Sequence, residues 1–360
     1  KAGCALGNWY GLLRARRALK GICAMSDRKA MMATFLLLAG WAKASRRPLA
    51  GDASNRRYDR LTNFDGARAV LMDAPPSKGE DVAPFIAVAD YLARHGLSAP
   101  KLLARDMVEG FLLLEDLGDD LFARVLVEAP EKEETLYAAA TDVLLHLHAQ
   151  KPLASMTRYG PFEMAEAACL ALDWYAFFAG QPVAQPERGR FRDLLQGLLE
   201  AADPGQSVMT LRDFHAENLI WLPNRHATRQ VGLLDFQDAM LCHPAYDLAS
   251  LLNDARRDVG DATRESCIKR YTDATRYDPA AFACGFATCS AQRNLRIMGV
   301  FARLSVRDGK KSYPDLMPRV WGNLMRDLSH PDLSEVKARI HSLLPEPTPD
   351  IIEKIKAANV

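Results

Sequence analysis

The chain contains Leu-Arg-Asp-Phe-His-Ala-Glu-Asn at Leu211–Asn218, followed by Leu-Leu-Asp-Phe at Leu233–Phe236. Asp213 and Asn218 share one loop, and Asp235 ends the next apolar segment. A carboxylate beside an acceptor hydroxyl can orient it and take its proton, and carboxylate and amide oxygens are suitable Mg²⁺ ligands. We predict phosphoryl transfer from ATP, with Asp213 as the catalytic residue and Asn218 and Asp235 as Mg²⁺ ligands.

Each of these three residues also has a simpler interpretation. Asp213 can cap the backbone amides that follow it, Asn218 can stabilise a turn, and Asp235 can end a strand. Asp213 alone favours the simpler interpretation. The three side chains together favour the catalytic one, because phosphoryl transfer depends on positioning and charge neutralisation.

Composition indicates a globular protein without an electrostatic footprint for nucleic acid or a membrane surface. The 46 basic and 45 acidic residues give a net charge of +1. The longest apolar run, 30–42, is too short to span a bilayer, and we expect no signal peptide. The 7 cysteines are scattered without CxxC spacing, which predicts reduced thiols in a cytoplasmic protein.

Hydrophobic periodicity predicts an α+β, bilobal chain with a small sheet-rich N-lobe and a larger helical C-lobe. We expect an N-terminal extension without structure over 1–25, an N-lobe that binds nucleotide over 26–115, a C-lobe that carries the catalytic and substrate-binding residues over 116–345, and a mobile tail over 346–360. Strands are predicted around Leu49 and at 56–61, 67–73, 102–103 and 111–114, with short apolar segments at 218–222 and 231–236. Helices are predicted at 27–41, 82–95, 133–149, 163–179, 189–202, 246–257, 263–275, 279–306 and 315–328.

The motifs at 211–218 and 233–236, with His-Pro-Ala-Tyr-Asp-Leu-Ala at 243–249, resemble the aminoglycoside phosphotransferase and choline kinase superfamily. The resemblance covers nearly all of the chain from about Met25 to Leu344. It implies a protein-kinase-like fold and the same roles for the catalytic Asp and the two Mg²⁺ ligands. It also implies that Asp247 is structural, capping the following helix and bracing the catalytic loop.

A closer resemblance is to the anomeric sugar kinases of cell-wall recycling, which phosphorylate N-acetylmuramate and N-acetylglucosamine at C1. It rests on Pro-Leu-Ala-Gly-Asp-Ala-Ser-Asn-Arg-Arg-Tyr at 48–58 and on the segments 70–76, 215–223, 232–239, 292–294 and 300–304. It implies an ATP- and Mg²⁺-dependent enzyme with a small amino-sugar substrate that forms a sugar 1-phosphate. We expect a monomer.

The expected nucleotide site departs from the common kinase pattern. Met72 occupies the strand position where a kinase usually carries its phosphate-binding Lys, so another cation must replace it. Arg57 is the favoured candidate over Arg56, although both fit a solvated strand equally well. Small residues in the turn, Gly51 and Ser54, would let backbone amides approach phosphate, and backbone groups from Glu115 to Leu117 would bind adenine.

For the acceptor we expect contacts from His215, Asp238 and Arg293, although a structural role is the alternative for each. A kinase of an aminoglycoside, choline or another amino alcohol is the alternative enzyme. Such cationic acceptors need an acidic or aromatic pocket, so the charges around Asp213 distinguish the two. A regulatory or scaffold protein with a degenerate nucleotide site is the rival outside the enzymes. The missing strand Lys favours that rival, and the intact Asp213, Asn218 and Asp235 oppose it.

Overall fold

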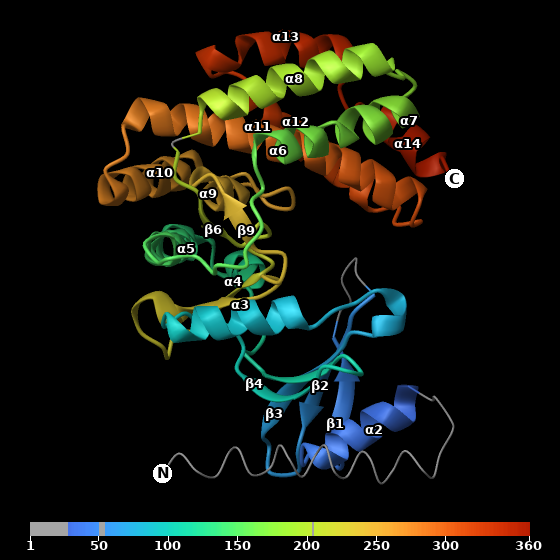
Figure 1. The fold of residues 1–360 in the computed structure, drawn as a ribbon, viewed down its shortest axis with the longest axis vertical. Helices are drawn as coiled ribbons and strands as arrows, with labels where there is room; N and C mark the ends of the chain where they lie inside the picture. The colour runs from blue at the N-terminus through green and yellow to red at the C-terminus, as the bar shows by residue number, and fades with distance from the viewer. Residues whose placement is uncertain (1–27, 50–54, 204) are drawn as a thin grey trace. The chain divides into compact units, whose positions relative to one another are not determined.

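The computed structural model describes residues 28–49, 55–203 and 205–360. The predicted extension 1–25 and the turn residues Gly51 and Ser54 lie outside the described residues. The described chain forms two compact units (Figure 1). One contains 28–49, 55–89 and 100–117, and the other contains 90–99, 118–203 and 205–360.

The first unit is built on one antiparallel five-stranded sheet with the order β1-β2-β3-β5-β4. Its strands are β1 Ser45–Pro48, β2 Arg57–Thr62, β3 Arg68–Asp73, β4 Leu102–Asp106 and β5 Phe111–Glu115, and its helices are α2 Arg28–Leu38, a 3-10 turn Pro76–Lys78 and the start of α3 Ala83–Arg94. Pro48 lies on edge strand β1, where a residue without an N–H is tolerated.

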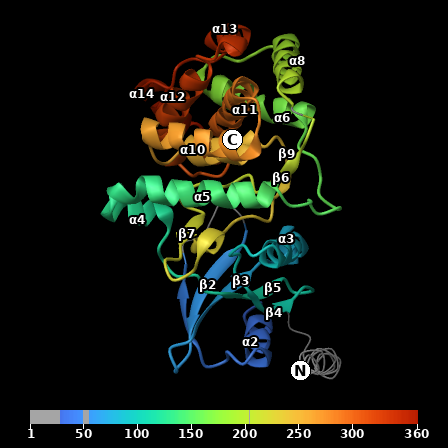
Figure 2. The same ribbon diagram turned by 90° about the vertical axis from the view of Figure 1, so that its left-hand side faces the viewer.

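Helix α2 lies against one face of this sheet (Figure 2), and its apolar residues pack onto it. Met32, Phe35 and Leu36 form a buried cluster with residues of β2, β3 and β5. Phe111 to Leu114 are all buried, which explains why β5 is a continuous apolar run. At the end of the sheet, the buried Arg60 guanidinium donates to Asp116 at 2.9 Å. The sequence-predicted strands are confirmed, with β1 ending one residue before Leu49.

The second unit is mainly helical, with two small antiparallel sheets that pair β6 with β9 and β7 with β8. Its strands are β6 Val208–Thr210, β7 Leu219–Trp221, β8 Val231–Leu233 and β9 Met240–Cys242. Its helices are α4 Phe122–Glu128, α5 Glu133–His148, α6 Pro161–Ala168, a π-helical segment Ala171–Ala176, α7 Phe177–Ala179, α8 Gln185–Ala201, α9 Ala245–Leu252, α10 Asp261–Thr275, α11 Pro279–Val306, α12 Met317–Asp327, α13 Ser334–Leu343 and α14 Pro349–Ala357; 3-10 turns occupy Pro130–Lys132, Ala227–Gln230, Tyr313–Leu316 and Pro331–Leu333.

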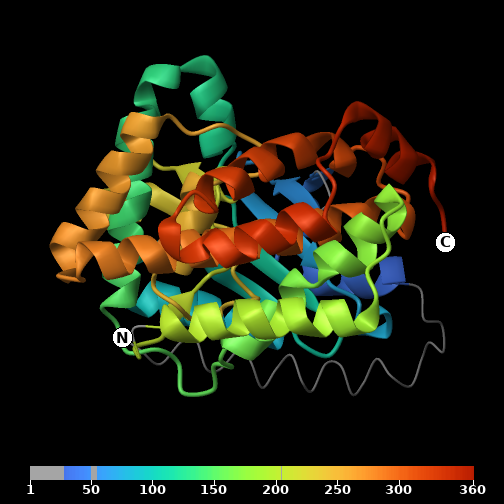
Figure 3. The same ribbon diagram turned by 90° about the horizontal axis from the view of Figure 1, so that it is seen from above.

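Helix α11 is the central element of the second unit. It is buried over most of its length and packs against α6, α9 and α12, while α8 and α13 run beside one another (Figure 3). Gly299 permits a close approach, because a Cβ at this position would lie 2.2 Å from the backbone carbon of Leu170. The 3.6-residue periodicity predicts α11 with the bounds that the structure shows, 279–306.

Two predictions for the second unit need correction. The prediction of a mobile tail is wrong for 349–357, which form α14 with Ile352 and Ile355 buried in the core. Thr348 accepts a hydrogen bond from the Ile351 N–H and caps this helix. Helix α9 ends at Leu252 rather than Arg257. Within the described residues, no helix has the length and apolar character needed to cross a membrane.

Candidate active site

The loop that carries Asp213 is held by a buried carboxylate on α9. Asp247 accepts hydrogen bonds from the backbone N–H groups of Leu211, at 2.5 Å, and Arg212, at 2.9 Å. These bonds hold Arg212 at φ 70°, a left-handed conformation that costs energy for a side chain with a Cβ. Asp247 therefore braces the loop as the resemblance implied, but it does not cap α9, whose cap position is Pro244.

Asn218 and Asp235 lie at the same end of the β7–β8 hairpin. Asn218 directly precedes β7, and the Leu234 N–H that follows β8 donates to the Asn218 carbonyl at 2.9 Å. The Asn218 amide nitrogen donates to the backbone carbonyl of Asp213 at 2.9 Å, so Asn218 links the Asp213 loop to the hairpin end that carries Asp235. Asp235 adopts φ 54°, and its carboxylate accepts from Gln237 at 2.6 Å. A carboxylate and an amide oxygen at one hairpin end fit Mg²⁺, which needs few protein ligands.

The charges around Asp213 keep its carboxylate ionised. Burial alone would raise its pKa, but the guanidinium groups of Arg296 and Arg293, with smaller contributions from His215 and Arg212, outweigh burial. The pKa of Asp213 is therefore lowered from its ordinary value of 3.8. The carboxylate is ready to accept a hydrogen bond from an acceptor hydroxyl at neutral pH.

His215 lies beside the side chain of Asn218, with its Nε2 3.4 Å from the Asn218 amide nitrogen. Burial lowers the pKa of His215 to about 4, so the imidazole is neutral at physiological pH. A neutral imidazole adds no positive charge next to the predicted Mg²⁺ ligands.

Two arginines of α11, Arg293 and Arg296, face this loop one helical turn apart. Arg293 is 4% exposed, and within the described residues its Nε and Nη1 have no hydrogen-bond partner. The same holds for Nε of Arg296. Burial lowers the pKa of Arg293, whereas the phenol of Tyr246 raises the pKa of Arg296. Buried cationic donors without partners are costly in a folded protein unless an anionic ligand satisfies them.

The sequence predicted Arg293 here but missed Arg296 and Arg212. Helical spacing offered a signal for Arg296, because residues three apart share one face of a helix. Asp238 is exposed in the turn after β8, and in the described chain no hydrogen bond joins it to Asp213.

The first unit contains three described residues that we predicted to contact the nucleotide: Arg57, Glu115 and Leu117. Arg57 is exposed at the start of β2, and its neighbour Arg56 forms an ion pair with Glu80 at 2.8 Å. The Glu115 N–H donates to the Lys101 carbonyl at 2.8 Å. The Glu115 N–H is therefore already used inside this unit, and the prediction of an adenine contact passes to the backbone of Asp116 and Leu117. Met72 is fully buried on β3, so no cation extends from that position.

A loop braced by a buried Asp, an ionised Asp213 and two candidate oxygen ligands at one hairpin end are the features that a phosphoryl-transfer site requires. Residues 45–282 match the phosphotransferase enzyme family, and the chain belongs to this family.

Curated relatives cover most of the chain. It is 39% identical to the N-acetylmuramate/N-acetylglucosamine kinase of Caulobacter vibrioides, over 90% of this chain and 98% of that protein. It is 32% identical to the protein of the same name from Pseudomonas aeruginosa, over 84% of this chain and 91% of that protein.

Solved structures confirm the protein-kinase-like α+β fold. A choline/ethanolamine kinase family protein from Mesorhizobium loti aligns with a TM-score of 0.57 at 16% identity, covering 92% of this chain and 99% of that one. Choline kinase LicA from Streptococcus pneumoniae aligns with a TM-score of 0.56 at 14% identity, covering 85% and 99%.

Proposed function

We propose that this protein is an ATP- and Mg²⁺-dependent kinase that phosphorylates the anomeric C1 hydroxyl of N-acetylmuramate and N-acetylglucosamine in peptidoglycan recycling. The names of its curated relatives support this acceptor class. In the reaction, the C1 oxygen forms a bond to the γ-phosphorus, the bond to ADP breaks, and the hydroxyl proton passes to Asp213. Mg²⁺ on Asn218 and Asp235 would neutralise phosphate charge.

The observation that carries this proposal is the positive potential beside Asp213. Arg293 and Arg296 both lower the pKa of Asp213. Among the described residues, Nε and Nη1 of Arg293 and Nε of Arg296 have no hydrogen-bond partner, although Arg296 also interacts with the Tyr246 phenol. Donors of this kind suit an anionic group, either a transferring phosphoryl group or the lactyl carboxylate of N-acetylmuramate. They disfavour choline or an aminoglycoside, whose cationic groups need the opposite charge.

The lowered pKa of Asp213 also supports an anomeric acceptor. A carboxylate with a lowered pKa is a weak base, and it works best on a relatively acidic hydroxyl. A hemiacetal hydroxyl is more acidic than an ordinary alcohol, so it matches this base better than the hydroxyl of choline does. An ionised Asp213, bonded through its backbone carbonyl to the proposed Mg²⁺ ligand Asn218, also argues against a degenerate scaffold protein.

The nucleotide contacts remain part of this proposal. The Glu115–Leu117 backbone would hold adenine, and Gly51, Ser54 and Arg57 would hold the phosphates in place of the missing strand Lys. His215 and Arg293 are the acceptor contacts that we retain, with Asp238 a weaker one because it is exposed. We propose a cytoplasmic monomer.

The test is ³¹P NMR of the purified protein with ATP, Mg²⁺ and one acceptor at a time: N-acetylmuramate, N-acetylglucosamine, kanamycin or choline. We expect a sugar 1-phosphate doublet with each sugar and no ester with the two cationic acceptors. A phosphate ester on kanamycin or choline, with no sugar product, would refute the proposal.

A further inference from the structure

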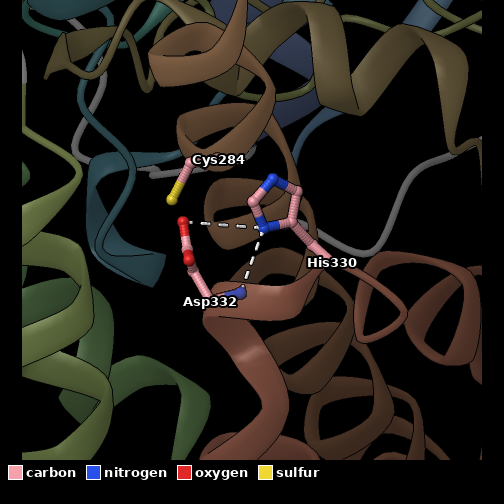
Figure 4. Close-up of side chains that lie close together, drawn as sticks. All are labelled: Cys284, His330 and Asp332. Carbon is pink, nitrogen blue, oxygen red and sulfur yellow. Dashed lines mark hydrogen bonds and ion pairs between the residues drawn. The ribbon is translucent and has the colours of Figure 1, made fainter.

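Three side chains with metal-binding atoms meet at the beginning of α11, and none of them belongs to the residues proposed for catalysis or substrate binding. Cys284 lies in the second turn of α11, and His330 and Asp332 lie in the turn before α13 (Figure 4). One thiol sulfur, one imidazole nitrogen and one carboxylate oxygen lie within 4.8 Å of one another. Within the described residues, this is the one such group of three His, Cys, Asp or Glu side chains.

We propose that Cys284, His330 and Asp332 form a binding site for Zn²⁺, with water as the fourth ligand. The ligand set is one soft sulfur, one borderline nitrogen and one hard oxygen, a combination that Zn²⁺ accepts and that Mg²⁺ does not. Its function is structural, because it joins α11 to the turn that leads into α13.

The distances are close to those of a tetrahedral zinc site. His330 Nδ1 lies 3.8 Å from the Asp332 carboxylate oxygen. Zn–N and Zn–O bonds of about 2.0–2.1 Å at tetrahedral angles separate two such atoms by roughly 3.3 Å. The His330 and Asp332 ligand atoms therefore need to approach by only about 0.5 Å, the Cys284 sulfur lies within 4.8 Å of both, and Asp332 is exposed and able to rotate.

The imidazole already presents an unprotonated nitrogen to the cluster. His330 Nδ1 accepts a hydrogen bond from the Asp332 N–H at 3.3 Å, so the neutral ring carries its proton on Nε2. This bond is long, and the Nδ1 lone pair is available to a metal that replaces it. Pro331 restricts His330 to an extended backbone, φ −64° and ψ 131°, which limits the movement of this ligand.

The thiol must lose a proton when the metal binds. Burial and a hydrogen bond to Asp332 raise the pKa of Cys284, so the thiol is protonated at neutral pH without a metal. Binding converts the thiol to a zinc-bound thiolate and releases one proton to solvent. The affinity for Zn²⁺ therefore increases with pH as the ligands lose their protons.

A cavity gives the metal a path to two of these ligands, Cys284 and Asp332. It has a volume of about 390 Å³ and is lined by Cys284 and Asp332 together with Tyr277, Phe282 and His243. Cys284 is half-buried and reaches solvent through this cavity, which also has room for the water that completes the coordination.

The experiment uses the full-length protein, treated with a chelator, dialysed and then titrated with Co²⁺ or Zn²⁺ in excess Mg²⁺. With Co²⁺ we expect visible bands of a tetrahedral ion and a thiolate-to-metal charge-transfer band, saturating at one ion per chain. Zn²⁺ should displace the Co²⁺ and raise the melting temperature. The charge-transfer band should disappear in Cys284→Ser, and Asp332→Asn should weaken Zn²⁺ binding at least about tenfold.

Two controls separate this site from other metal binding. Asp273→Asn changes a surface carboxylate with the same exposed side-chain fraction as Asp332, 62%, and should leave the Zn²⁺ affinity unchanged. Asp235→Asn removes a proposed Mg²⁺ ligand and should leave the Co²⁺ spectrum unchanged. Three outcomes would overturn the proposal. The first is equal Zn²⁺ affinity in Asp332→Asn and Asp273→Asn, the second is absence of the thiolate band in the wild type, and the third is loss of the Co²⁺ spectrum in Asp235→Asn.

Discussion

Replacing Asp213 with Asn tests the central assignment with little disturbance of the loop. The backbone of Asp213, not its side chain, accepts the hydrogen bond from Asn218, and its N–H donates to the Leu211 carbonyl at 2.9 Å. Asp247 also holds the loop through backbone groups. Asp213→Asn therefore removes one carboxylate and keeps the position of the neighbouring metal ligand.

The size of the expected loss follows from the role of this carboxylate. A positioned general base contributes about 10²- to 10⁴-fold to kcat, which corresponds to roughly 3–5 kcal/mol of activation free energy. Nucleotide affinity should change little, because Asn218 and Asp235 remain. Since the pKa of Asp213 is lowered from 3.8, its protonation should not reduce wild-type kcat/KM above about pH 4.

The assay measures kcat for sugar phosphorylation by ³¹P NMR and ATP affinity by equilibrium titration with Mg²⁺. Glu217→Gln is the matched control, because it changes an exposed carboxylate in the same loop, where Glu217 pairs with Arg256 at 2.8 Å. We expect its kcat to stay within a few-fold of wild type. The reasoning fails if Asp213→Asn retains kcat within tenfold of wild type, or if it loses ATP binding as strongly as turnover.

Three further substitutions test charge and packing. Arg293→Met should lower kcat/KM about 10- to 150-fold, because it removes a charge-assisted contact to the ligand. It should not lower the free energy of unfolding in urea, because the lost group is a buried cation whose Nε and Nη1 have no partner among the described residues. Lower stability with unchanged activity would contradict this prediction. Burial raises the pKa of Asp327 from 3.8 to about 7. At a pH between 3.8 and 7 the folded protein therefore binds a proton at Asp327 that the unfolded chain does not, and the free energy of unfolding should fall as the pH rises from 5 to 7. Asp327→Asn should remove about 2 kcal/mol of that fall, and an unchanged slope of unfolding free energy against pH would refute it. Ile355→Ala should lower the free energy of unfolding in urea by about 2–5 kcal/mol, because it empties a buried position in the core. The exposed control Glu353→Ala should lower it by less than about 0.5 kcal/mol. Equal losses would show that α14 is not packed against the core.

The C-terminal segment shows where the sequence-based prediction failed. Glu-Pro-Thr-Pro at 346–349 is typical of a mobile end, yet Thr348 caps a helix whose first residue is Pro349. Threonine followed by proline is also a helix-start signal, and Ile352 and Ile355 share one face. Composition favoured a loop, but burial of these two isoleucines in the core stabilises a helix too short to be stable alone.

Local patterns in the sequence were enough to predict most element types and the α+β class, and they place Asp213, Asn218 and Asp235 on one loop and hairpin, where their roles stay a prediction. These features depend on periodicity and on spacing along one loop and hairpin, which are properties of short segments of the chain. The charges that surround Asp213 could be identified only after folding, because Arg293 and Arg296 come from a distant helix and their effect on its pKa depends on burial and proximity. The same is true of Cys284 and His330, which become neighbours only when α11 packs against the turn before α13.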